Sequence, residues 1–381
     1  MRVRITRREL AGAVADLGVL VPIAVALIVS NGLSPTAVLL PAGLLYLANA
    51  AIYGLPLPSQ PLKAFGAIAI AEGLGADEIA AGALLIGALF LVAGRLGLVD
   101  RLARAFPRPL VRGVQFAVGL LFLQIAWNLA ADPPAAFAEH ALPPVWAVGL
   151  ALAAAAVALA FRGAGAALAL VAVGAVAMVA TAGGSASLGP SALAVPSLDL
   201  GVLATAFVVL VVPQAPLSFA NSCLATADAA RVYFGEERAR RVRPGSLAST
   251  YGVANLFAGS IGGMPVCHGA GGLTAHYTFG ARTAAAPLVM GSVLVVLALA
   301  VGSGLAALLV AFPLPILAAL LAVAGLLHIG LLRDLQGAPA WAAALLVGAL
   351  GATVGLAVAL AAGLALWWLP VAVRRARLVL D

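Results

Sequence analysis

Apolar runs of roughly 20 residues follow one another along nearly the whole chain, separated by short segments rich in Arg, Gly or Pro. Each run is long enough for an α-helix to cross the roughly 30 Å hydrocarbon core of a bilayer. Transmembrane β-strands show shorter segments of alternating polarity. The pattern therefore predicts an all-α polytopic membrane protein with about 14 transmembrane segments. In chain order, these segments are expected at about residues 10–31, 36–54, 57–73, 79–97, 110–130, 144–161, 164–182, 200–224, 245–261, 265–281, 284–303, 305–327, 338–353 and 356–372.

The third and tenth segments are interrupted in the same way. Residues 54–63 read Gly-Leu-Pro-Leu-Pro-Ser-Gln-Pro-Leu-Lys, and residues 263–272 read Gly-Met-Pro-Val-Cys-His-Gly-Ala-Gly-Gly. Because proline removes a backbone donor and clashes with the preceding turn, each interruption predicts extended backbone followed by a half-helix. Extended backbone at membrane depth is tolerated only inside protein or along a wet cavity. Paired interruptions in two halves of a chain are typical of the substrate site of a secondary transporter.

Arginine-rich loops mark the cytoplasmic side of a membrane protein. Those of this chain cover residues 2–8, 95–112, 231–243 and 374–377. The pattern predicts a multi-pass protein of the cell inner (cytoplasmic) membrane with both termini in the cytoplasm.

Seven segments in each half is an odd number, so the second half must enter the membrane upside down relative to the first. The prediction is a first inverted repeat over residues 1–190 and a second over residues 191–381. Segments 1–4 and 8–11 are expected to form a core domain, and segments 5–7 and 12–14 a gate domain.

The composition agrees with a membrane protein, since 64% of the residues are hydrophobic and 9% are charged, whereas a soluble domain is about 25% charged. The formal net charge of +7 comes from arginines in the short loops, so it predicts topology and no nucleic-acid partner. Two cysteines, Cys223 and Cys267, imply no disulfide framework. We expect no metal and no cofactor, and the chain has no nucleotide-binding motif for direct drive by ATP.

The two interruptions together predict an anion site. Each half-helix is expected to present free N–H groups and a positive dipole end near the middle of the membrane. Lys63, which is the only lysine of the chain, adds a full positive charge at the first helix end. Gly269 and Gly271, on either side of Ala270, allow a ligand to approach the backbone closely. These features favour an anionic substrate.

The eighth segment adds polar groups on one predicted helix face. Gln214, Ser218 and Asn221 are spaced at i, i+4 and i+7, so their donors are expected to point the same way. Asp16 lies inside the first apolar run, and an intramembrane carboxylate is a functional candidate, here for coupling transport to protons. His276 and His328 are interpreted as structural or interfacial.

Five separated motifs, at residues 9–18, 58–63, 213–218, 267–272 and 279–282, carry a further signal. Together they resemble the molybdate transporter family, which is related to the sulfate permeases and shares a seven-plus-seven inverted-repeat arrangement with nucleobase permeases. The resemblance implies molybdate uptake by movement of a core domain against a gate domain, and it puts Gln60 and His268 on substrate-facing elements. Ser59 and Leu62 stand where the family is expected to have an aliphatic residue and Met. The predicted substrate-binding residues are Ser59, Gln60, Lys63, Gln214, Ser218, Asn221, His268, Gly269, Ala270 and Gly271.

The leading hypothesis is a secondary active transporter that imports molybdate by alternating access. The alternatives are a sulfate, other anion or nucleobase permease of the same fold, a passive anion channel, and a membrane enzyme that uses Cys267 and His268. A nucleobase carrier is expected to offer carboxylates where this chain has amides, glycine and histidine. The enzyme alternative has no clear acid to orient the histidine. The sequence leaves open a co-transported proton and a homodimer.

Overall fold

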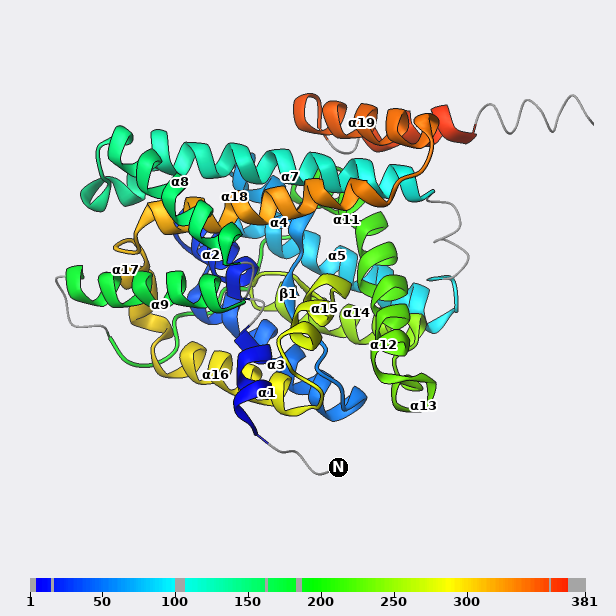
Figure 1. Cartoon of the computed structure of the whole chain (residues 1–381), viewed down its shortest axis with the longest axis horizontal. Coiled ribbons are helices and arrows are strands. Elements are labelled where there is room, and N and C mark those ends of the chain that lie inside the picture. The colour runs from blue at the N-terminus through cyan, green and yellow to red at the C-terminus, as the bar shows by residue number, and fades with distance from the viewer. Residues whose placement is uncertain are drawn as a thin grey trace, which may run out of the picture.

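The computed structural model describes residues 5–14, 17–99, 107–161, 164–182, 187–355 and 358–368. This part of the chain is mostly helical, with two short strands that pair near the middle of the molecule (Figure 1). Five described helices are long and apolar enough to cross a membrane, and a bent pair makes a sixth. The prediction of a helical membrane protein is therefore confirmed, while these six segments do not establish the count of about 14. Shorter apolar helices account for several of the remaining predicted segments.

In chain order, the elements are α1 (Arg7–Ala13), α2 (Leu17–Val29), α3 (Pro35–Tyr53), β1 (Gln60–Pro61), α4 (Lys63–Ala71), α5 (Ala76–Arg95), α7 (Arg108–Ala131), η2 (Ala135–His140), α8 (Pro144–Ala160), α9 (Ala164–Thr181), α10 (Leu200–Thr205), η3 (Ala206–Val211), α11 (Val212–Leu217), η4 (Ser218–Ala225), α12 (Thr226–Phe234), α13 (Glu236–Ala239), α14 (Pro244–Ser260), β2 (Val266–Cys267), α15 (Ala270–Thr278), α16 (Ala285–Ala300), α17 (Gly302–Leu309), α18 (Leu314–Gly330), η5 (Leu331–Asp334) and α19 (Ala338–Thr353).

Local sequence signals explain where α3 begins and ends. The Ser34 hydroxyl accepts a hydrogen bond from the Ala37 N–H at 3.4 Å, and Pro35 stands at the first helical position, where its missing N–H costs nothing. The helix ends at Gly54, whose φ of 66° lies in the left-handed region that favours glycine. The chain therefore leaves α3 directly into the first interruption.

The segment expected at residues 305–327 is divided in the structure. Residues 302–309 form α17, which bends by 91° from α16, and α18 begins only after Pro313. Proline is favoured at the start of a helix but not in its interior, so Pro313 and Pro315 set the start of α18. The prediction of one span over residues 305–327 was therefore wrong at its amino end, because the prolines start a new helix there.

Three pairs of long helices cross so closely that their backbones are in contact. In each pair a glycine of one helix faces a glycine of the other, and a Cβ added to either one would lie within 3.0 Å of the partner's carbonyl oxygen. Small residues allow this close approach of helices in membrane proteins. The crossings join α3 to α16 at Gly43 and Gly291, α5 to α14 at Gly87 and Gly252, and α7 to α18 at Gly119 and Gly325.

The helix pairs follow a simple exchange rule. Helix α3 precedes β1 as α14 precedes β2, and α5 follows α4 as α16 follows α15. When the two halves of the chain are exchanged, the pair α3 and α16 becomes the pair α14 and α5, which also pack together. The pairs α7 with α18 and β1 with β2 are exchanged into themselves. These helix and strand pairs therefore stay the same when the two halves are exchanged.

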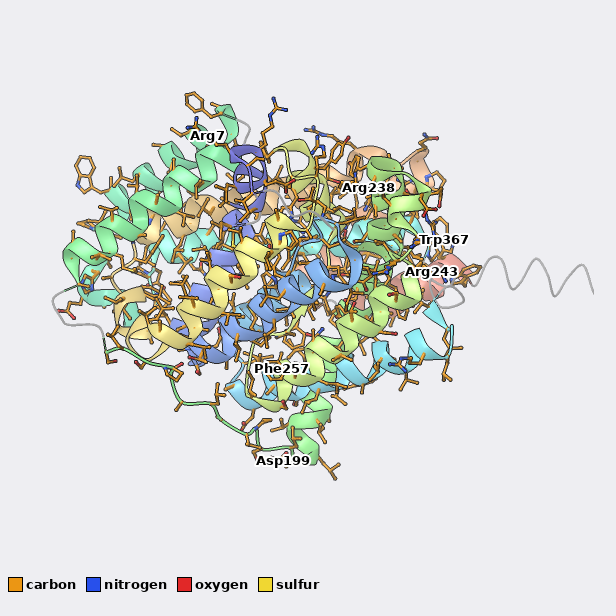
Figure 2. The ribbon with its side chains drawn as sticks, turned by 90° about the horizontal axis from the view of Figure 1, so that it is seen from below. Arg7, Asp199, Arg238, Arg243, Phe257 and Trp367 are labelled. Atoms are coloured by element: carbon orange, nitrogen blue, oxygen red, sulfur yellow. The ribbon has the colours of Figure 1, made fainter. Side chains whose placement is uncertain are left out.

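Helices α7, α8, α18 and α19 pack together along one side of the molecule (Figure 1). Figure 2 shows Arg7 and Arg238 along one side and Asp199, from an arginine-poor segment, on the opposite side. The described arginine-rich segments around these two arginines are thus separated from Asp199 by the helical body.

The glycine crossing between α5 and α14 can be tested by adding one methyl group. In Gly87→Ala the new Cβ would lie 2.7 Å from the Leu256 backbone nitrogen and 3.0 Å from the Gly252 carbonyl oxygen. We expect a loss of about 1–3 kcal/mol of stability, because overpacking forces the helices apart. Thermal unfolding of the purified protein in detergent measures this loss.

Gly149→Ala, on α8, is the matched control, because a Cβ there meets nothing within 4 Å. This variant should unfold at or above the wild-type temperature, since alanine has the higher helix propensity. Equal unfolding temperatures for both variants would contradict the crossing described here.

Candidate functional site

The two interruptions meet as a pair of antiparallel strands. Gln60 lies opposite Cys267 and Pro61 lies opposite Val266, and the Leu62 N–H donates to the Pro265 carbonyl at 3.2 Å. Helix α4 starts two residues after β1, and α15 starts three residues after β2. The amino ends of both helices are therefore brought to the same region of the protein.

Two buried asparagines satisfy the extended backbone on either side of the strands. Asn49 of α3 donates to the Pro58 carbonyl at 2.9 Å. Asn255 of α14 forms two hydrogen bonds with the backbone of Val266, each of 2.8 Å. Buried backbone groups need such partners when no helix or wide sheet supplies them. The strands are thus held by the helices that precede them.

Gln214 and Ser218 are engaged in capping α4. The Gln214 side-chain oxygen accepts the Phe65 N–H at 3.0 Å, and its amide nitrogen donates to the Ser218 hydroxyl at 3.0 Å. The Ser218 hydroxyl lies 2.9 Å from the Tyr251 hydroxyl. Gln214 therefore satisfies one of the N–H groups that a helix start leaves without an intrahelical partner.

A small enclosed chamber lies at the amino end of α4. Its volume of about 20 Å³ is room for about one water molecule. Lys63 reaches it half-buried, and its ammonium group donates to the Gln60 side-chain oxygen at 3.0 Å. The residues that line the chamber are Lys63, Gln115, Gln214, Leu217, Asn221, Ser222, Cys267 and His328.

Gly269 allows two predicted site residues to come together at the start of α15. A Cβ at Gly269 would collide with the Gln60 side-chain oxygen and would lie 3.7 Å from the Asn221 amide nitrogen. Gln60, Lys63, Asn221 and Gly269 therefore form one cluster, which Gln214 adjoins through the chamber.

Other predicted site residues lie outside the described lining of the chamber. His268 is fully buried, and its Nε2 lies 2.9 Å from the Thr250 hydroxyl. Ser59 is also fully buried. Gly271 is exposed, and a Cβ there would meet open space. Ala270 is half-buried at the first position of α15, and Asp16 lies outside the residues that the structure describes.

The chamber includes two residues from the helices on the other side, which the sequence did not indicate. Gln115 comes from α7 and His328 from α18. The His328 Nδ1 lies 2.8 Å from the Ala324 carbonyl, and the ring meets Phe122 edge-on at 5.8 Å between centroids. The interpretation of His328 as structural or interfacial is therefore incomplete. A polar residue inside an apolar run is the sequence feature that could have indicated Gln115 and His328. It does not indicate which helices pack against each other, so it could not place these residues at the chamber.

His276 matches its interpretation as a structural residue. Its Nδ1 lies 2.9 Å from the Pro56 carbonyl, and its ring stacks on Tyr46 with a centroid distance of 6.2 Å. The contact ties α15 to the start of the first interruption.

A larger cavity of about 360 Å³ adjoins the chamber. The two share Gln115 and Asn221, which therefore form the boundary between them. Arg112 lies in the cavity wall, donates to the Gln115 side-chain oxygen at 2.6 Å and forms an ion pair with Asp334. Arg108 in the same wall pairs with Asp334 at 2.6 Å. The cavity that adjoins the chamber is thus lined by two guanidinium groups.

The architecture of this chain is similar to that of solved anion transporters. The transmembrane domain of a cyanobacterial bicarbonate transporter, BicA, matches with a TM-score of 0.67 and 20% identity over 94% of this chain and 98% of that domain. The inward-facing murine Slc26a9 anion transporter matches with a TM-score of 0.68 and 15% identity over 98% of this chain and 70% of its own. These likenesses establish the fold.

The sequence places the chain within one family. A family model described as the molybdate transporter of the MFS superfamily matches residues 8–122 and 206–327. Molybdate transporter 1 of Arabidopsis thaliana is 33% identical over 83% of this chain and 78% of its own length. Molybdate transporter 1 of Chlamydomonas reinhardtii is 45% identical over 30% of this chain and 22% of its own. The chain belongs to the molybdate transporter family.

Membership in this family decides against the membrane-enzyme alternative. The geometry agrees, because the Cys267 sulfur lies 3.8 Å from the Pro61 carbonyl, while the His268 Nε2 is engaged by Thr250.

The cap of α4 predicts a structural role for Gln214 that can be separated from substrate binding. Gln214→Leu leaves the buried Phe65 N–H without its partner, which costs about 1–3 kcal/mol. We expect a lower unfolding temperature in detergent without any substrate. Gln115→Leu is the control, because its partner Arg112 keeps the ion pair with Asp334. An unchanged unfolding temperature in Gln214→Leu would show that the cap contributes nothing.

Proposed function

We propose that this protein is a secondary active transporter that imports molybdate across the cytoplasmic membrane. The oxyanion binds where the amino ends of α4 and α15 approach each other, within an enlarged form of the chamber beside Lys63. The observation that carries the proposal is the clustering of Gln60, Lys63, Asn221 and Gly269 at the paired strands. Helix amino ends and a half-buried ammonium group both favour a negative ligand.

The chemistry of the chamber favours a dianion over a nucleobase. Among its described lining residues, the polar groups are an ammonium, amides, a hydroxyl, a thiol and an imidazole, and none is a carboxylate. Amide and hydroxyl groups can donate hydrogen bonds to oxyanion oxygens. Sulfate is a tetrahedral dianion like molybdate, so it is the alternative substrate that shares this chemistry.

Alternating access supplies the space that the substrate needs. The chamber of about 20 Å³ is too small for a tetrahedral oxyanion, so the chamber must widen before the substrate binds. Gln115 and His328 come from α7 and α18, whereas Lys63 and Cys267 come from the paired interruptions. Movement of a gate domain with α7 and α18 against a core domain with α4 and α15 opens the chamber.

This proposal includes two inverted repeats, residues 1–190 and 191–381, with α4 and α15 as half-helices within about 14 spans. The exchange rule for the helix pairs supports the repeats. The positions of Arg7 and Arg238 opposite Asp199 support an orientation with the arginine-rich loops, and so both termini, in the cytoplasm (Figure 2). The cavity at Arg108 and Arg112 is then the cytoplasmic exit.

The remaining predicted site residues have supporting roles in this mechanism. Ser59, His268, Ala270 and Gly271 flank the strands and the start of α15, and they position the backbone that faces the oxyanion. Coupling to a proton at Asp16 stays a prediction from the sequence, and so does a homodimer.

Uptake into proteoliposomes tests the substrate directly. We expect saturable accumulation of molybdate against its concentration gradient, measured by mass spectrometry of the vesicle contents. Sulfate in tenfold excess should compete partly, because it offers the same charge and shape. Sulfate or uracil uptake without molybdate uptake would reject the proposed substrate, and non-saturable downhill flux would indicate a channel.

Lys63→Met tests the charge at the site, because methionine keeps much of the apolar stem without the ammonium group. We expect a rise of at least about tenfold in the KM for molybdate, since one charge-assisted hydrogen bond contributes about 1.5–3 kcal/mol. Arg95→Gln is the control, because Arg95 is an exposed residue in the last turn of α5. Equal KM values for wild type and Lys63→Met would remove Lys63 from the site.

A further inference from the structure

Two adjoining clefts open beside α13 and the start of α14, away from the chamber. They have volumes of about 600 and 440 Å³, and Arg240 and Arg241 line both. Arg243 lines the larger cleft and Arg238 the smaller. Neither cleft shares a described lining residue with the chamber or with the cavity at Arg108. The arginine clefts are therefore separate from the proposed path of the substrate.

Three of these arginines are oriented by the backbone and are not neutralised by carboxylates. Arg238 donates to the Arg282 carbonyl at 2.7 Å, Arg241 to the Ile52 carbonyl at 3.3 Å, and Arg243 to the Arg240 carbonyl at 3.0 Å. Within the described residues, Arg240 alone of the four forms an ion pair, with Glu237 at 3.3 Å. Carbonyl contacts hold the guanidinium groups but leave their charge uncompensated.

The clefts also have an apolar side, which distinguishes their ligand from a free anion. Ile52 lies in the last turn of α3, is 39% exposed and lines the larger cleft together with the arginines. Guanidinium groups are suited to bidentate binding of phosphate oxygens. A basic cluster next to the end of an apolar helix is placed to meet the charged surface of a membrane leaflet.

We propose that the arginine clefts bind the phosphate-bearing headgroup of an anionic phospholipid, with Arg238, Arg241 and Arg243 contacting the phosphate and Ile52 contacting the start of the acyl chain. Figure 2 shows Arg238 and Arg243 on the same part of the surface, beside the helical body. A phospholipid headgroup and free phosphate both present a phosphate monoanion or dianion. The exposed Ile52 favours the membrane lipid as the source of this phosphate.

Native mass spectrometry of the full chain, purified in detergent and titrated with phosphatidylglycerol, tests the proposal. The variant Arg238→Gln/Arg241→Gln/Arg243→Gln should retain at least about tenfold less phosphatidylglycerol, because each arginine near a lipid surface contributes roughly fivefold in affinity. Phosphatidylcholine, whose headgroup has no net charge, should bind wild type and variant equally. A third titration, with inorganic phosphate, measures binding of a free anion.

Arg7→Gln/Arg95→Gln/Arg333→Gln is the matched control, because it removes the same charge at three exposed positions outside the clefts. It should retain phosphatidylglycerol as wild type does. Equal retention by the cleft variant and wild type would overturn the proposal, as would an equal loss in the control variant. Arginine-dependent binding of inorganic phosphate without binding of phosphatidylglycerol would overturn the lipid source.

Discussion

Backbone pairing between β1 and β2 is the constraint on which the rest of the structure depends. A helix satisfies its own hydrogen bonds within a membrane, but the prolines and glycines of the two interruptions prevent this. The strand pair, Asn49 and Asn255 supply the missing partners. Two segments far apart in the sequence must therefore meet inside the protein, and α4 and α15 begin from the same place. The glycine crossings let the surrounding helices close tightly around that point.

The charges of this region are arranged differently from those of the cavity at Arg108 and Arg112. Lys63 is paired with the neutral side chain of Gln60, and the amino end of α4 is capped by the neutral side chain of Gln214. Neutral oxygens stabilise these positive groups without cancelling them, so a positive potential remains for a ligand. At Arg108 and Arg112, by contrast, Asp334 offsets the charge. In the proposed mechanism, the oxyanion therefore binds strongly near the strands and is attracted more weakly along the cavity at Arg108 and Arg112.

The π-helical turns of the eighth segment connect packing to the site. Proline at positions 213 and 216 cannot donate to the preceding turn, and the backbone is π-helical on both sides of α11. Gln214 caps α4 and donates to Ser218 at the start of the π-helical η4, and Asn221 of the same η4 reaches the chamber. One segment therefore supports the start of α4 through Gln214 and lines the chamber through Gln214 and Asn221.

The sequence by itself determined the helical membrane class, the extents of α3, α5, α7 and α14 to within a few residues, the two interruptions and the family. Apolar run length and proline chemistry act locally, so they can be read without a structure. Only the tertiary structure decided which contacts join Gln60, Lys63, Asn221 and Gly269, which the sequence had assigned to one site, that His268 contacts Thr250, and that Gln115 and His328 line the chamber. The sequence of a span that is apolar on every side does not indicate which face packs against another helix. That choice depends on close contacts such as those at the glycines, which arise between segments distant in the sequence.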